Sequence, residues 1–294
     1  MTAAKTLTGN FPIGIRLTGP LAERPVLETA RWAILQGFGC VDIPANQLAN
    51  LDTWPSASLP VGTIDLFGSE WTGMLSADAI TRRTTVVAAK KFIRDAAAAG
   101  ARIIFVVMLA EDVKLSRRET FGYMVETYGQ LRDVLAETGL HLAIEGWPGC
   151  NAHCCNPESY RAFLKEMNSS HFGINYDPSH LIRMGIDPLR FIKEFAPQVV
   201  HMHGKDTLID DDRLYEIGHE QDGVFAANFP WGGFSWRYTI PGKGRAPWSE
   251  LLAELVAVKY RGYVSIELED VDYNGTLAGE QRGFVEARKF LQSI

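Results

Sequence analysis

Short runs of β-branched and other apolar residues alternate along this chain with longer stretches of helical periodicity. Strict alternation of strand and helix signals predicts a parallel sheet, because each helix returns the chain to the edge where the next strand starts. The run at 102–108 is continuously apolar, as strands covered on both faces are. We therefore expect eight parallel strands, at 13–17, 41–43, 61–66, 102–108, 141–145, 172–176, 199–203 and 263–268.

The stretches between these runs predict helices. Apolar residues recur at helical spacing from Phe121 to Leu135, and Gly139 is the expected end of that helix. Eight strand–helix units favour a closed barrel over an open sheet, and no GxGxxG follows the first strand, which weakens a dinucleotide-binding fold. No linker divides the chain, so residues 1–294 are predicted to form one α/β domain, a single (β/α)₈ TIM barrel. The expected helices lie at 21–36, 81–99, 121–135, 157–167, 188–196, 248–255 and 280–291.

One connection, the loop at 207–245 after the seventh strand, is far longer than the others. It has about forty residues without a clear helix, and loops of that length are usually functional. Six aromatic residues in it need apolar partners. We expect a lid over the site that packs on the barrel, on a second subunit or on the substrate. The six are Phe225, Phe229, Trp231, Phe234, Trp236 and Tyr238.

Metal-capable side chains stand at the ends of four consecutive predicted strands. In a barrel of this kind the chemistry lies at the carboxyl ends of the strands. A single strand-end carboxylate is usually a salt-bridge partner, and a single histidine is usually structural, but four in succession favour a metal site. The four are Glu145, Asp177, His203 and Glu267. Three carboxylates with one imidazole suit one divalent metal, Mn²⁺ first, with Mg²⁺ or Co²⁺ as alternatives.

The segments around these residues resemble those of a known family. AIEGWPG, NYDPSH, HMHGKD and SIELED are similar to segments of xylose isomerase-like TIM barrels, which include the sugar phosphate isomerase/epimerase group, D-tagatose 3-epimerase and C-glycoside deglycosidase catalytic subunits. The resemblance is specific from about residue 141 onward. It implies that the four residues bind one metal and that Glu145 and Glu267 are the catalytic proton-transfer pair. It also implies that His180 hydrogen-bonds a substrate oxygen.

Further residues are secondary candidates for substrate binding. Lys205 either holds a substrate oxygen or pairs with a ligand carboxylate, and Trp147 is expected to form an apolar wall. Arg237, in the long loop, is a third candidate. His201 shares strand parity with His203 but lies one layer deeper, which favours a structural role.

The predicted activity is that of a divalent-metal-dependent sugar isomerase or epimerase. A metal acting as a Lewis acid lowers the free energy of the enediolate that forms when the proton next to a carbonyl leaves, and two carboxylates can move that proton. The alternative is a lyase, a deglycosidase that cleaves a 3-keto-glycoside by enolisation and β-elimination. The first half of the chain lacks obvious catalytic residues, and its second strand reads VDIPAN where many relatives carry a glutamate, which leaves the substrate open.

Composition bounds the partners and the compartment. With 29 basic and 35 acidic residues the net charge is −6, so no nucleic acid partner is expected. An endonuclease IV-like nuclease is disfavoured also because no histidine precedes His141. Neither a signal segment nor a membrane helix is apparent, so we expect a cytoplasmic enzyme that acts on a small carbohydrate, as a monomer, homo-oligomer or hetero-oligomer. Cys150, Cys154 and Cys155 form either a loop of reduced thiols, a small zinc knot or an edge of the active site.

Overall fold

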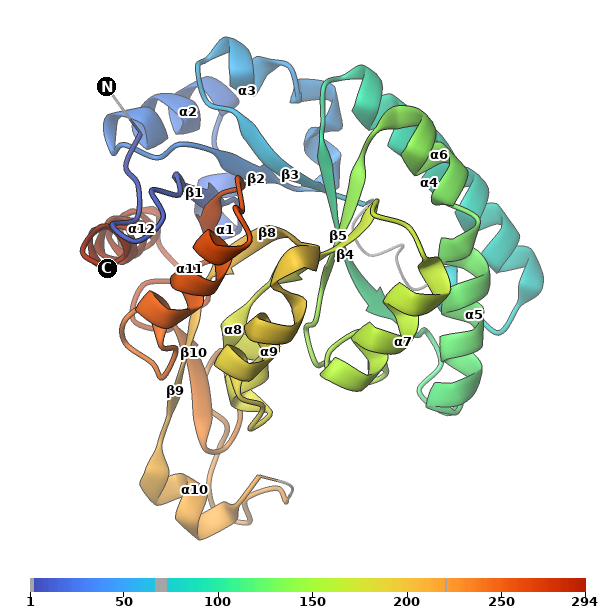
Figure 1. The fold of residues 1–294 in the computed structure, drawn as a ribbon. Coiled ribbons are helices and arrows are strands. Elements are labelled where there is room, and N and C mark those ends of the chain that lie inside the picture. Colours follow the sequence, from blue (N-terminus) through green and yellow to red (C-terminus); the bar gives the residue numbers. More distant parts are fainter. Residues whose placement is uncertain (1–2, 67–72, 220) are drawn as a thin grey trace.

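Eight parallel strands form a closed barrel at the centre of the computed structural model, which describes residues 3–66, 73–219 and 221–294 (Figure 1). The strands follow the order β3-β2-β1-β11-β8-β7-β5-β4, and pairing of β3 with β4 closes the ring. The predicted (β/α)₈ barrel is confirmed. The strands are β1 (Ile13–Arg16), β2 (Val41–Ile43), β3 (Val61–Asp65), β4 (Ile103–Leu109), β5 (His141–Glu145), β7 (Phe172–Tyr176), β8 (Val199–Gly204) and β11 (Val264–Ile266).

Helices surround the barrel on its outer side (Figure 1). Side-chain caps fix where many of them begin, because the first backbone N–H groups of a helix lack partners within it. Ser116 and Glu119 form a capping box at α5, and Asn156 caps α7, where Pro157 follows. The helices are α1 (Gly19–Ala22), α2 (Val26–Leu35), α3 (Thr53–Ser56), α4 (Ala79–Ala98), α5 (Arg117–Gly129), α6 (Arg132–Thr138), α7 (Pro157–Met167), α8 (Pro178–Arg183), α9 (Pro188–Phe195), α11 (Trp248–Ala257) and α12 (Leu277–Gln292).

Two predicted helices are each divided in the structure. The helix expected at 21–36 is interrupted at Pro25, which stands at the start of α2, because proline has no N–H for the helix and disfavours helical geometry before it. The helix expected at 121–135 is divided into α5 and α6 near Gly129. Glycine has a lower helix propensity than every residue except proline. The apolar residues of both halves still face the core, so the periodicity was correct and the continuity was wrong.

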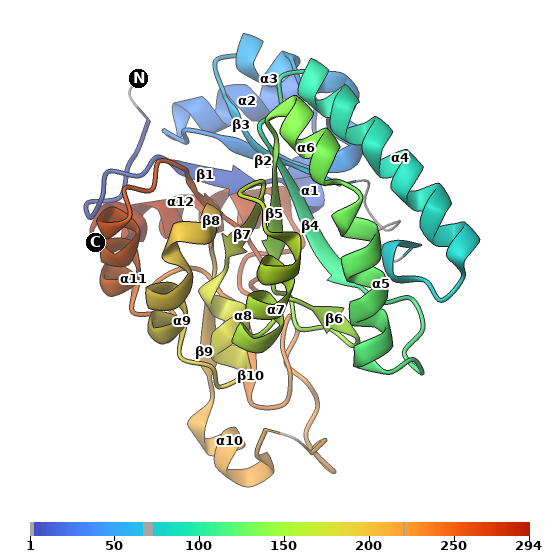
Figure 2. The same cartoon turned by 45° about the vertical axis from the view of Figure 1, so that its right-hand side comes forward.

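The long segment after β8 forms an arm that projects from the carboxyl end of the barrel (Figures 1 and 2). The expectation of no helix there was wrong. Strands β9 (Asp206–Ile209) and β10 (Trp236–Thr239) pair antiparallel at its base, and α10 (Asp211–Ile217) lies at its tip. Asp210 caps α10 by accepting a hydrogen bond from the Arg213 backbone, a signal that the sequence already contained.

Aromatic residues of this arm differ widely in exposure. Phe225 is 100% exposed and Trp231 is 48% exposed, whereas Tyr238, at the base, is buried. The expectation that these rings pack on other groups therefore holds for the base of the arm and not for all of it. Within the residues that the structure describes, every helix is too short or too polar to span a bilayer.

Candidate functional site

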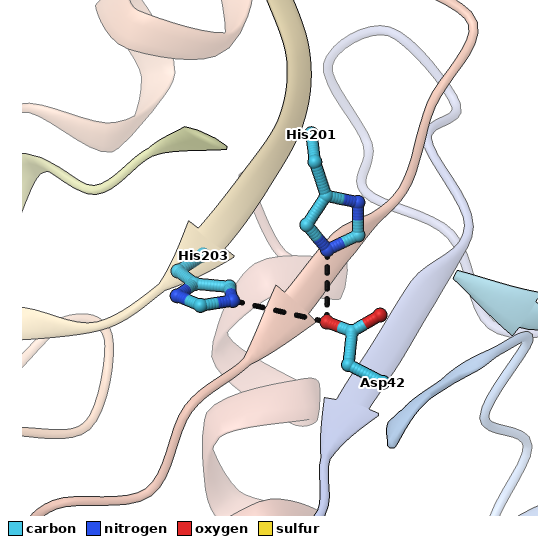
Figure 3. A group of neighbouring side chains, drawn as sticks. All are labelled: Asp42, His201 and His203. Atoms are coloured by element: carbon cyan, nitrogen blue, oxygen red, sulfur yellow. Dashed lines mark hydrogen bonds and ion pairs between the residues drawn. The ribbon is translucent and has the colours of Figure 1, made fainter. Parts of the chain in front are cut away.

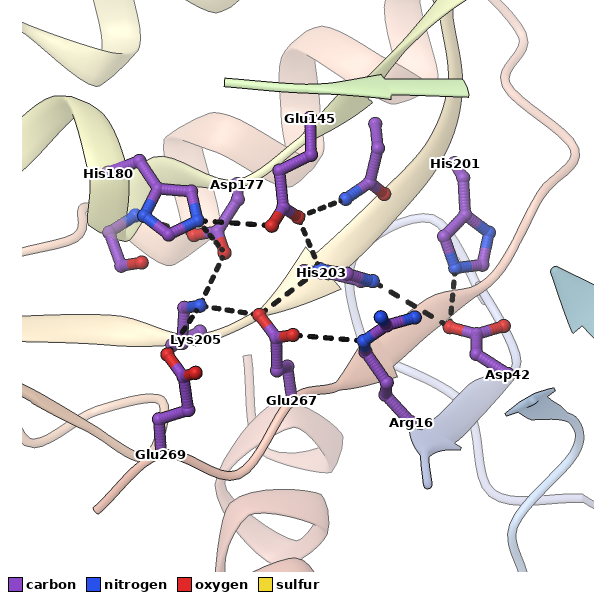
Figure 4. Close-up of polar contacts among 12 residues, drawn as sticks. Arg16, Asp42, Glu145, Asp177, His180, His201, His203, Lys205, Glu267 and Glu269 are labelled. Atoms are coloured by element: carbon purple, nitrogen blue, oxygen red, sulfur yellow. Dashed lines mark hydrogen bonds and ion pairs between the residues drawn. The ribbon is translucent and has the colours of Figure 1, made fainter. Parts of the chain in front are cut away.

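The four predicted metal ligands meet at the carboxyl end of the barrel (Figure 4). Glu145 ends β5, Asp177 follows β7, His203 lies in β8, and Glu267 follows β11. One ligand atom from each lies within 4.8 Å of all the others, and all four residues are buried. Neighbouring parallel strands carry their ends to the same edge, so residues far apart in sequence converge there.

Polar atoms that lack a hydrogen bond at the centre of this cluster fit a bound cation. Asp177 Oδ2 and both ring nitrogens of His203 are buried without a hydrogen-bond partner among the described residues. His203 Nδ1 lies 2.6 Å from Glu145 Oε2 and 3.4 Å from Glu267 Oε2, and these contacts lack hydrogen-bond geometry. Buried polar atoms are normally bonded. Three carboxylates and one imidazole, converging on one point, are a donor set that suits a divalent metal.

Electrostatics keep the two glutamates of the cluster ionised. Burial and Glu267 raise the pKa of Glu145, but contacts with His203 and His180 outweigh both and leave it well below its usual range. Burial also raises the pKa of Glu267, but Lys205, His203 and Arg16 together outweigh burial and leave this pKa well below its usual value. Burial lowers the pKa of His203, and the two glutamates raise it to about 10. The two glutamates and the His203 imidazolium therefore stabilise one another.

Lys205 lies among the same carboxylates. Its Nζ is 3.3 Å from Asp177 Oδ2 and 3.0 Å from Glu269 Oε2, and it also contacts Glu267. Burial lowers the pKa of Lys205, but these carboxylates raise it well above its usual value, so the amine is charged. The lysine pairs with ligand carboxylates, which was one of the two roles expected for it.

His180 connects the ligands to the base of the arm. Its Nε2 lies 3.2 Å from Glu145 Oε1, and its Nδ1 lies 2.7 Å from the hydroxyl of Tyr238. Arg183 donates to the same hydroxyl at 2.7 Å. The base of the arm therefore contributes Tyr238 to the site, a residue that the sequence analysis counted only as one aromatic among six.

Two other predicted substrate residues lie outside these contacts. Trp147 is 37% exposed, and its ring covers Gly149, where an added Cβ would lie 1.9 Å from the ring. Arg237 binds Asp270 at 2.8 Å and Asp272 at 2.9 Å, beside the site rather than within it. Alternation along β10 turns Tyr238 toward the ligands and its neighbour Arg237 elsewhere.

Residues of the first half of the chain that sequence reasoning missed also reach the site. Arg16 ends β1, and its Nε lies 3.0 Å from Glu267 Oε1. Its other nitrogens bind both oxygens of Asp65, at 2.8 and 3.1 Å, and the guanidinium lies over the Phe105 ring. The predicted strands ended one residue later, at Leu17 and Leu66, and arginine is not a metal ligand, so the pattern of metal-capable strand ends included neither Arg16 nor Asp65.

Asp42, in β2, also lies next to the candidate ligand His203 (Figure 3). Its Oδ2 accepts a hydrogen bond from His201 Nε2 at 2.8 Å and lies 3.8 Å from His203 Nε2. Burial raises the pKa of Asp42, but His201 and His203 lower it by more, so this pKa lies below its usual value. His201 thus has a supporting position one layer below the cluster, as expected, and Asp42 comes from the VDIPAN segment that seemed to lack a functional group.

Asn175 is a further missed residue, and its Nδ2 donates to Glu145 Oε2 at 2.5 Å.

The cysteine loop forms no metal cluster within the described residues, so the zinc-knot alternative is not supported. Cys154 and Cys155 are buried and lie near the backbone oxygens of Ser159 and Ala152, while Cys150 is exposed. All four cysteines of the chain are free thiols.

Comparison with known proteins identifies the family. Residues 56–294 match the sequence profile of the xylose isomerase-like TIM barrel family, and the chain belongs to that family. Inosose dehydratase of Bacillus anthracis is 28% identical over 186 residues, which cover 63% of this chain and 58% of that protein. The chain spans between 31% and 58% of the length of the first curated relatives it matches.

Solved structures share the fold. A structure of D-psicose 3-epimerase in the presence of D-fructose superposes with a TM-score of 0.72 at 17% identity, covering 95% of this chain and 97% of that one. A structure of the IolI protein with a bound zinc atom superposes with a TM-score of 0.68 at 16% identity, covering 95% of each chain.

Proposed function

We propose that this protein is a divalent-metal-dependent sugar isomerase or epimerase that moves a proton next to a carbonyl group. One observation carries the proposal: the donor atoms of Glu145, Asp177, His203 and Glu267 converge within 4.8 Å at the carboxyl end of the barrel. The fold shared with D-psicose 3-epimerase supports a carbohydrate as the substrate class. The zinc in the IolI structure supports a metal, and the carboxylate-rich donor set favours Mn²⁺, Mg²⁺ or Co²⁺.

Two glutamates carry the proton in this proposal. A bound divalent metal would polarise the substrate carbonyl as a Lewis acid. Glu145 and Glu267 come from β5 and β11, which β7 and β8 separate, so the two carboxylates enter the site from different sides. One takes the α-proton of the substrate, which becomes an enediolate, and the other returns a proton to the opposite face. Both carboxylates are ionised at neutral pH, as a general base must be.

His180 and Lys205 are proposed to bind substrate oxygens. His180 already contacts Glu145 and Tyr238, which fix its ring in place. Lys205 is charged and lies next to Glu267, where it would stabilise an oxyanion on the substrate. Trp147 and Arg237 are proposed only as outer walls of the substrate site.

A metal-dependent lyase is the second candidate. The same proton abstraction produces an enolate that expels a leaving group from the β-carbon, as in cleavage of a 3-keto-glycoside. The similarity to inosose dehydratase favours this outcome, because a dehydratase expels water. Both candidates use the same metal and the same first step, so the products distinguish them.

Metal content and product analysis test the proposal together. Purified protein should hold one divalent metal per chain by elemental analysis, and removal of the metal by a chelator should abolish turnover until Mn²⁺, Mg²⁺ or Co²⁺ is restored. In D₂O, proton NMR of D-fructose, D-tagatose and a 3-keto-glucoside should show deuterium at the carbon next to the carbonyl. An epimer then indicates the isomerase, and an unsaturated product with a released group indicates the lyase. Activity unaffected by complete metal removal would refute both.

Asp177→Asn has a matched control in Asp187→Asn. Each aspartate caps a helix that begins with proline and accepts from a backbone N–H two residues later at 2.8 Å. Asparagine caps a helix about as well as aspartate, so both variants should keep the cap and the stability of the parent. Only Asp177→Asn should lose the metal, and equal metal content in the two variants would remove Asp177 from the ligand set.

A further inference from the structure

A hollow of about 730 Å³ lies at the amino end of the barrel, opposite the metal ligands. The first residues of several strands surround it: Val61 of β3, His141 of β5 and Val199 of β8. His141 begins the strand that Glu145 ends, so the hollow lies about 13 Å from the ligand cluster. Residues at this face of a barrel usually serve stability rather than catalysis.

The charge of the hollow is one-sided. Arg102, Lys259 and Arg261 line it together with His141, and no aspartate or glutamate is among its described lining residues. In the part of the chain that the structure describes, none of these three cations has an ion pair to a carboxylate. Three cations around one concave surface that no lining carboxylate neutralises give that surface a local positive charge, in a protein whose net charge is −6.

Lys259 occupies a position that usually requires glycine. It follows the C-cap of α11 with φ of +59°, in the left-handed region, and its N–H bonds to the carbonyl of Val256. Glycine is preferred there because a side chain in this conformation costs on the order of 1 kcal/mol. A lysine at this position gives up that stability and adds a cation to the hollow.

The remaining lining is apolar and aromatic. Leu51, Pro55, Pro60 and Pro197 contribute apolar surface, and Tyr263 is half-buried at the edge. A concave surface of this volume with a few convergent charged groups is typical of small-molecule sites. Inorganic ions alone would leave most of this surface without a partner.

We propose that this hollow binds a small organic anion, either a phosphate monoester or a carboxylic acid with an apolar body, at a site separate from the candidate metal cluster. Arg102 and Arg261 hold the anionic group through their planar forks, and Lys259 contributes a third charge. The proline and leucine surface contacts the body of the ligand. This inference does not depend on the reaction proposed for the other end of the barrel.

Calorimetric titration of the metal-loaded protein with phenyl phosphate, inorganic pyrophosphate and citrate tests the site. The parent should bind phenyl phosphate or citrate with a Kd below about 1 mM, the affinity range of a few charge-assisted contacts. Arg102→Gln combined with Arg261→Gln should weaken that binding at least about ten-fold. The control is Arg190→Gln, an exposed arginine near the start of α9, which should bind like the parent.

A second variant protects the test against misfolding. Lys259→Gly removes a charge and relieves the left-handed strain, so it should be at least as stable as the parent while it binds the anion more weakly. Unchanged affinity in both Lys259→Gly and the double variant would overturn the proposal, because the anion would then bind elsewhere, for example at the metal. Absence of binding by all three probes to the parent would overturn it as well. Tighter binding of pyrophosphate than of phenyl phosphate would refute the apolar part of the site.

Discussion

The two halves of the barrel contribute to the candidate site in different ways. The second half, from β5 onward, supplies all four candidate ligands. The first half supplies groups that contact those ligands: Arg16 pairs with Glu267, and Asp42 lies behind His203. The comparison suggests that one half determines the chemistry while the other fixes the orientation of the groups that perform it. Groups behind a ligand commonly affect metal affinity or activity by 10–100-fold.

Replacement of either proton carrier should have the largest effect. Glu145→Gln and Glu267→Gln keep the size of the side chain but cannot take up a proton, so kcat should fall by at least about 10²–10⁴-fold. Steady-state kinetics with metal content measured in the same samples checks this, and Glu250→Gln, an exposed glutamate on α11, is the control. Near-normal kcat in a metal-loaded variant would remove that glutamate from the proton-transfer pair.

Arg16→Lys should have the next largest effect, because it alters the first half alone. Lysine keeps the charge but cannot bind Asp65 with two nitrogens while a third contacts Glu267. We expect kcat to fall about 10–100-fold, with KM changed much less, since Arg16 acts through Glu267.

The control for Arg16→Lys is Arg24→Lys. Arg24 pairs with Glu28 on the surface, where an ion pair contributes little, so that variant should behave like the parent. If Arg16→Lys changes KM and leaves kcat intact, Arg16 contacts the substrate, and the division of labour between the two halves is wrong.

The same contrast explains what the sequence could predict. Residue types at strand ends predict which side chains meet, because the barrel brings all those ends to one edge regardless of the sequence between them. A positioning contact depends on a particular pair, and Asp42 meets His201 across 159 positions of sequence. Nothing local to either residue specifies that contact. Tyr238 was missed for a related reason, since its role depends on how the arm folds back on α8.

The fold was likewise predicted where many residues share a pattern and missed where a single residue decides. Strand positions followed from continuous apolar runs, and β5, β7 and α7 begin and end where the sequence predicted. The division of the first predicted helix at Pro25 and the presence of α10 were both signalled by single residues, a proline and a capping aspartate. The periodicity of apolar residues carries neither signal, because it depends on the spacing of side chains and not on caps or prolines.

The arm provides a smaller test, because its base reaches the ligands and its tip does not. Tyr238→Phe removes the hydroxyl that contacts His180 and Arg183, so kcat/KM should fall about five- to ten-fold, as for the loss of one hydrogen bond of about 1 kcal/mol. Trp231→Ala removes a ring that is 48% exposed and should leave kinetics unchanged. If the exposed rings of the arm contact a second subunit, Trp231→Ala should change the molar mass measured by light scattering. Kinetic loss in Trp231→Ala with unchanged assembly would instead support a lid.

The smallest expected effect concerns stability at a place where the halves meet, away from the ligands. His153 lies in β6 (Ala152–His153), which pairs with β4, and its Nε2 lies 2.7 Å from the hydroxyl of Thr120. Burial and, to a smaller extent, Arg117 lower the pKa of His153 to about 4. An unfolded chain has a histidine pKa of about 6.5.

Between pH 6.5 and 4 the unfolded chain therefore binds a proton that the folded chain does not. The contribution of His153 to the free energy of unfolding is complete above pH 6.5 and decreases as the pH falls through this window. His153→Gln keeps an amide donor for Thr120 but does not titrate, so its stability should depend less on pH. Urea unfolding at pH 7.5 and pH 5 should show a loss of stability that is larger in the parent by about 1 kcal/mol, after allowance for solvent screening. Equal losses in the two proteins would show that His153 does not control acid sensitivity. Unchanged kinetics in the same variant would separate this contact from the chemistry at the strand ends.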